Sequence, residues 1–119
     1  MSTFLLDKCY ETFNTSAAFI EFHQDKDHRQ AFNASQLIGF SLAPNPGADT
    51  DRNEPPQKLA LVFATADVVL LGWRLGFLAD RLRESTLAAV GLIPKRYVEL
   101  ERNPVFISVI KIEAVKKDV

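Results

Sequence analysis

The stretch LALVFATADVVLLGW, from Leu59 to Trp73, predicts two apolar strands joined by a tight turn. With a turn of two or four residues between the strands, Phe63 is expected opposite Val68. The next pair on the same face is then Leu61 with Leu70. Hydrophobic side chains line both faces of this hairpin, whereas an antiparallel sheet with one face in water alternates apolar and polar residues. We therefore expect both faces to be covered.

The two faces follow from the two-residue period of a strand. One face carries Leu59, Leu61, Phe63, Val68 and Leu70, and the other carries Ala60, Val62, Val69, Leu71 and Trp73. A helix of about fifteen residues is roughly 22 Å long and 10 Å wide, so it shields about two strands. We therefore expect the sheet to curl on itself, to bury a face against a second subunit, or both.

Shorter segments rich in β-branched and aromatic residues predict further strands, at residues 17–23, 30–33, 36–43 and 105–115. The segment 1–14 fits both a helix and a strand, and strand is favoured because β-structure dominates its neighbours. The stretch PNPGADTDRNEPPQ, residues 44–57, contains four prolines and a glycine and predicts a long polar loop. Apolar strands flank this loop on both sides, so we expect one domain, residues 1–119.

The stretch LGFLADRLRESTLAAV predicts the main α-helix, at about residues 75–90. One stripe of this helix is apolar. Its members are Leu75, Leu78, Ala79, Leu82, Thr86, Ala89 and Val90. Gly91 fits the position after the last helical residue, and Pro94 prevents continuation. Phe77 and Leu87 project off the stripe, which favours a partner contact.

These elements predict an α+β fold: a strongly curved antiparallel sheet of five or six strands, rolled or forming a partial barrel, with the helix packed on it or closing one end. The formal net charge of −1 argues against nucleic-acid binding, including a single-stranded nucleic-acid site on a curved sheet. The single Cys9 fits a reducing compartment. The chain shows neither a basic signal-peptide start nor an apolar run of about 18 residues, so we expect a cytoplasmic protein without a membrane segment.

The clearest group of possible metal ligands is EFHQDKDH, residues 21–28, in which Glu21, His23 and Asp25 share one strand face. Asp25 and Asp27 lie where the hairpin turn is expected, and turns favour aspartate for backbone reasons. We therefore interpret this stretch as a solvated hairpin tip.

A second motif, DTDRNE from Asp49, begins like a calcium loop. It has Glu54 where that loop needs glycine and Ala60 where it needs a bidentate glutamate. Only two histidines are present, no Gly-x-Ser-x-Gly motif occurs, and the glycines form no phosphate-binding loop. The sequence therefore predicts no catalytic residue, no metal and no cofactor.

The sequence favours a small cytoplasmic interaction module that forms a homodimer, binds itself or another protein, and performs no evident chemistry. C2 homodimers are the commonest closed assemblies. The candidate interface residues are Leu59, Leu61, Phe63, Val68, Leu70, Trp73, Phe77 and Val109, and the choice between the two faces stays open. The alternative is a small-molecule-binding protein or enzyme with a pocket in the concavity of the sheet, under the loop at residues 44–57.

Overall fold

The structure, a computed structural model, describes residues 9–25, 27–49, 52, 54–92 and 105–115. In chain order the elements are β1 (Tyr10–Thr12), β2 (Phe19–His23), β3 (Arg29–Asn33), the 3-10 helix η1 (Ala34–Gln36), β4 (Leu37–Pro44), β5 (Gln57–Phe63), β6 (Ala66–Trp73), α1 (Gly76–Arg83), β7 (Leu87–Gly91) and β8 (Phe106–Ala114). The described residues thus form eight strands and one α-helix, which confirms the expected α+β class.

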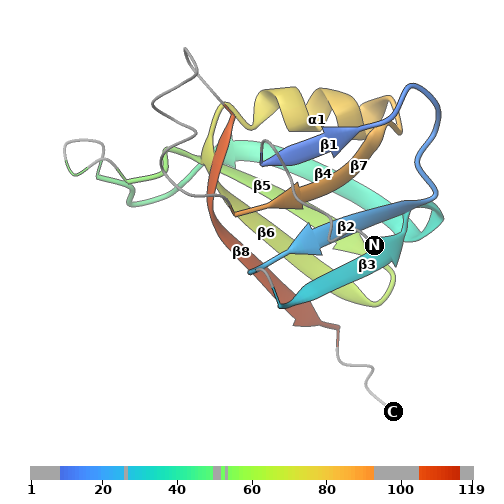
Figure 1. Cartoon of the computed structure of the whole chain (residues 1–119). Helices are drawn as coiled ribbons and strands as arrows, with labels where there is room; N and C mark the ends of the chain where they lie inside the picture. The colour runs from blue at the N-terminus through green and yellow to red at the C-terminus, as the bar shows by residue number, and fades with distance from the viewer. Residues whose placement is uncertain (1–8, 26, 50–51, 53, 93–104, 116–119) are drawn as a thin grey trace.

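The strands form two sheets of four, with α1 at one end of the pair (Figure 1). Sheet A has the strand order β1-β7-β2-β3, and sheet B has the order β4-β5-β6-β8. All neighbouring strands are antiparallel except β2 and β7, which are parallel. The core lies between the sheets, where the ring of Phe22 from β2 meets the ring of Phe63 from β5 edge to face, with centroids 6.0 Å apart.

This architecture corrects the expected single sheet of five or six strands. Sheet A covers one face of sheet B, so a second sheet buries the face that a single helix is too small to cover. The prediction assumed that strands that are consecutive in the sequence pair with each other, which is the commoner arrangement. Here β7 enters sheet A between β1 and β2, although more than sixty residues separate β2 from β7.

The hairpin of β5 and β6 forms as predicted, with a register that differs by two residues. Leu61 pairs with Val68, and Leu59 pairs with Leu70. The turn consists of Ala64 and Thr65, so it begins one residue earlier than a turn centred in ATAD. A shift of two residues keeps every side chain on its face, and the two predicted faces are therefore unchanged.

The predicted helix over residues 75–90 is wrong in its second half, because α1 ends at Arg83. The main chain of Ser85 donates to the carbonyl of Leu82, and that of Thr86 donates to the carbonyl of Arg81, both at 3.0 Å. Ser85 has a φ of 63°. These are the two bonds and the left-handed residue of a Schellman motif, which ends a helix.

Residues Leu87–Gly91 continue as β7, in which every residue is buried. This strand lies between two others and is covered on both faces, so it is apolar without alternation. A short continuous apolar run fits a buried strand as well as a helix. Leu87 is therefore a core residue, contrary to the expected exposed position, and Gly91 ends a strand instead of capping a helix.

The predicted strands at residues 17–23, 30–33, 36–43 and 105–115 correspond to β2, β3, β4 and β8. Within the segment 1–14, the residues Tyr10–Thr12 form the strand β1, and residues 1–8 lie outside the described residues, as does the polar connection 94–104. The loop between β4 and β5 joins two paired strands. The main chain of Asn45 donates to the carbonyl of Pro56 at 2.9 Å, which extends the ladder one pair beyond Pro44 and Gln57.

Candidate functional site

No described helix or strand packs on the face of sheet B that points away from sheet A (Figure 1). We call it the outer face of sheet B. Its apolar members are Ala60, Val62, Val69, Leu71, Trp73 and Val109. They are half-buried, apart from Val62, which is 41% exposed. Four charged residues share this face, Lys58, Asp67, Lys111 and Glu113. Lys58 pairs with Leu71 and Lys111 pairs with Val69, so the surface combines apolar and charged side chains.

The structure divides the eight candidate interface residues into two groups. Five lie between the sheets, each at most 1% exposed, and are therefore unavailable to a partner: Leu59, Leu61, Phe63, Val68 and Leu70. The other three, Trp73, Phe77 and Val109, are at the surface. Trp73 lies beside Phe106, with ring centroids 5.6 Å apart, and pairs with it across β6 and β8.

Phe77 lies on α1, away from the outer face of sheet B. Its ring is 4.9 Å from the ring of Tyr10, and the guanidinium of Arg81 lies 4.9 Å from its centroid. These contacts on both sides leave it 38% exposed. Phe77 therefore belongs to a small surface cluster between β1 and α1, separate from Trp73 and Val109.

The strand β4 carries an exposed surface that the sequence analysis missed. Ile38 is 73% exposed, Phe40 is 37% exposed and Leu42 is 40% exposed. The strand stands at the end of sheet B, and among the described strands it pairs only with β5. The sequence carries one signal of this position, since residues 37–48 contain no charge and a proline closes the strand, a residue confined to edges and strand ends.

The tip of the β2–β3 hairpin is a hydrogen-bonded turn, in agreement with the interpretation of residues 24–28. The carboxylate of Asp25 accepts from the main chain of Asp27 at 2.7 Å and lies 2.8 Å from Nδ1 of His28. These contacts hold the pKa of Asp25 below its usual range, the main-chain hydrogen bond contributing most. Asp25 is therefore a turn residue.

His23 differs from Asp25. The sequence analysis interpreted the whole stretch 21–28 as solvated, and for His23 this interpretation is wrong. His23 is buried, and its Nε2 lies 3.3 Å from Oε1 of Glu21. Burial lowers the pKa of His23, and the carboxylate of Glu21 opposes that change. In the described part of the chain, no three side chains of the histidine, cysteine, aspartate and glutamate types are placed to share a metal ion.

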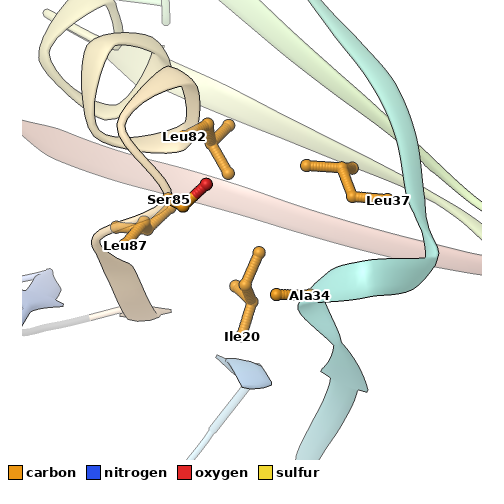
Figure 2. A pocket seen from close by; sticks show the side chains of 6 residues that line it. All are labelled: Ile20, Ala34, Leu37, Leu82, Ser85 and Leu87. Carbon is orange, nitrogen blue, oxygen red and sulfur yellow. The ribbon is translucent and has the colours of Figure 1, made fainter. Parts of the chain in front are cut away.

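A small cavity opens between the two sheets near the end of α1 (Figure 2). Its volume is about 30 Å³, and it is lined by Ile20, Ala34, Leu37, Leu82, Ser85 and Leu87. Figure 2 shows the hydroxyl of Ser85 as the one side-chain oxygen among carbon groups. Ligand sites of drug size occupy about 300–1,000 Å³, and none of the lining residues belongs to the loop 44–57. This cavity therefore does not provide the predicted ligand pocket.

Cys9, the single cysteine, is fully buried, and its Sγ donates to the carbonyl of Val105 at 2.8 Å. Burial raises the pKa of the thiol from 9.0 to about 11. The thiolate is the reactive form, and the higher pKa lowers its fraction at pH 8 about a hundredfold.

We therefore expect iodoacetamide to alkylate Cys9 in the native protein at least a hundred times more slowly than in the protein unfolded in urea. The measurement is mass spectrometry of samples quenched over time at pH 8, with free cysteine as the rate standard. Equal rates in the two states would show that the thiol is accessible.

Comparison of the chain with family models, with curated proteins and with solved structures finds no match in any of the three. None of the helices in the described ranges is long and apolar enough to cross a membrane. The outer face and the β4 edge of sheet B therefore form the candidate functional site.

Proposed function

We propose that this protein is a small interaction module that forms a homodimer through sheet B. The observation that carries the proposal is the apolar surface that sheet B leaves uncovered. Among the described residues, nine large hydrophobic side chains are exposed. Three of them, Ile38, Phe40 and Leu42, lie on the single strand β4, and Val62 on β5 lies on the other face of sheet B from Phe40 and Leu42. Single exposed hydrophobic residues are ordinary, whereas a contiguous group marks an interaction site.

The outer face of sheet B supports the same proposal. Leu71 pairs with Val109 across β6 and β8, and Ala60 pairs with Val69 across β5 and β6. Burying a leucine or valine side chain contributes about 1.5–3 kcal/mol relative to its exposure in water. Association that covers such side chains therefore recovers free energy that the folded monomer leaves unused.

A second copy is a suitable partner because the formal net charge is only −1. Two identical chains with a large net charge would repel each other, and at a net charge of −1 this repulsion is small. The buried Cys9 fits a reducing compartment, and we place the module in the cytoplasm as part of the proposal. We assign it no catalytic residue and no cofactor.

Sedimentation equilibrium tests the proposal. We expect a monomer–dimer equilibrium at micromolar protein concentration. The matched control is Phe19→Lys, which adds a charge to an exposed hydrophobic position of sheet A and is expected to leave the equilibrium unchanged. A monomer at every concentration up to about 100 µM, well above the micromolar affinity range, would overturn the proposal.

A further inference from the structure

The free edge of β4 differs from the other sheet edges of the described structure in its charge. The edges of the two sheets are β1, β3, β4 and β8. The strand β1 carries Glu11, β3 carries Arg29, and β8 carries Lys111 and Glu113. Charged side chains at an edge prevent pairing with another strand, and β4 has none.

Two features limit the open part of this edge. The register shifts between Leu37 and Gly39, which leaves Ile38 as the extra residue of a β-bulge. Pro44 closes the other end, and proline has no N–H to offer to a neighbouring strand. The segment that pairs with no strand on this side is therefore the five residues 39–43, and within it the side chain of Leu42 lies beside Gly76 of α1.

The direction of the main-chain groups follows from hydrogen bonds at the two ends of the β4–β5 ladder. The main chain of Asn45 donates to the carbonyl of Pro56, and that of Ala64 donates to the carbonyl of Gln36, both at 2.9 Å. Hydrogen-bonded pairs alternate with non-bonded pairs along antiparallel strands. Both bonds give the same alternation, in which the residues that face β5 are Gly39, Ser41 and Ala43.

Phe40 and Leu42 consequently direct their N–H and C=O groups toward the free edge. Their side chains are also more than one-third exposed, and they lie on the face of sheet B that carries Leu59 and Leu61. The edge thus offers two N–H groups, two carbonyl groups and two apolar side chains within three residues.

We propose that β4 pairs antiparallel with β4 of a second copy about a twofold axis through Ser41, which joins the two sheets B into one sheet of eight strands. Phe40 of each chain then exchanges two main-chain hydrogen bonds with Leu42 of the partner subunit, four bonds in all. The side chains of these two residues meet on one face, and Ser41 lies directly opposite Ser41 of the partner subunit on the other face.

A second copy fits this edge because the strand is complementary to itself. An uncharged strand meets its own copy without placing like charges opposite each other. The same patch serves both chains, as a twofold interface requires. Pairing of five residues from each chain makes a small contact, below the range of about 1,200–2,000 Å² typical of stable complexes, so we expect a micromolar dissociation constant.

Disulfide cross-linking of Ser41→Cys tests the register of this pairing. Directly opposite residues in a non-bonded pair have Cα atoms about 4.5 Å apart, within the range that a disulfide spans. We expect more than half of the protein at 50 µM to become a covalent dimer in a glutathione redox buffer. The wild type is expected to stay monomeric on a non-reducing gel, because its single cysteine, Cys9, is fully buried.

Ala43→Cys is the matched control, since Ala43 is exposed like Ser41 and points to the same side of β4. In the proposed register, two copies of residue 43 lie about 14 Å apart along the strands, so this variant is expected to cross-link at least tenfold less. The double variant Gly39→Cys/Ala43→Cys is expected to cross-link again, because these two positions face each other across the twofold axis.

The inference rests on the proposed self-association, and the outcomes separate the two. A dimer in sedimentation without preferential cross-linking at position 41 overturns the pairing of β4 and leaves the self-association standing. Equal cross-linking at positions 41 and 43 also overturns the pairing, because it indicates random collision. A monomer in sedimentation overturns both.

Discussion

Leu70→Glu is expected to unfold the protein at 25 °C. Leu70 is fully buried between the sheets, and it pairs with Leu59, which is fully buried as well. Removing a buried leucine side chain costs about 2–5 kcal/mol. Placing a carboxylate in the same position adds several kcal/mol, because no lysine or arginine is buried in the described part of the chain to pair with it. The sum is comparable to the whole stability of a small domain, about 5–15 kcal/mol.

The neighbouring position is the control. Leu71 lies next to Leu70 on β6, and its side chain points to the outer face of sheet B, where it is half-buried. We expect Leu71→Glu to fold, with a loss of about 1 kcal/mol or less, because its carboxylate reaches water. Circular dichroism in a urea titration measures both variants.

Equal loss of stability in the two variants would show that something covers the outer face as fully as sheet A covers the inner face. We also expect Leu61→Glu, in the core, to unfold the protein, and Val109→Glu, at the surface, to fold. Phe77→Glu is expected to fold too, because Phe77 is exposed on α1.

The sequence predicted the two faces of the β5–β6 hairpin but not their burial. The alternation along the hairpin predicted which residues share a face, and this assignment survived a register error because the error was two residues. It did not predict which face is covered. Both faces are apolar, and sheet A covers only one of them. The central strands of sheet A come from residues 19–23 and 87–91, which are distant from the hairpin in the sequence or were predicted as helix. Five of the eight candidate interface residues proved to be core residues for this reason.

The strand β7 was not predictable from local pattern. Thr86, Ala89 and Val90 have helical spacing with the residues before them, so the predicted apolar stripe of the helix continued through them and Leu87 was placed beside it. The Schellman motif at Ser85 separates the two elements, although serine is a rare choice for a left-handed position, which usually has glycine. The burial of His23 was missed for a related cause, since the neighbours on β7 are distant in the sequence.

Gly72 lies where the main chain of β8 passes close to β6. The register of β6 and β8 shifts between Leu71 and Gly72. A Cβ added at Gly72 would lie 2.0 Å from the carbonyl oxygen of Phe106 and 3.0 Å from the Cα of Ile107. Both contacts involve main-chain atoms, which move only if the pairing of β6 with β8 is disturbed. Ile107 is 1% exposed, so the disturbance reaches the core.

We therefore expect Gly72→Ala to lower the free energy of unfolding by about 3 kcal/mol or more, at or above the upper end of the cost of overpacking. Gly39→Ala is the matched control in the same sheet, because nothing lies within 4 Å of the Cβ that it would add. Replacing such a glycine restricts the unfolded chain and stabilises a protein by about 0.4–1 kcal/mol. Urea titrations of both variants give the comparison. Equal midpoints would mean that β8 accommodates the added methyl group, and that the strands are not held as closely at Gly72 as their register requires.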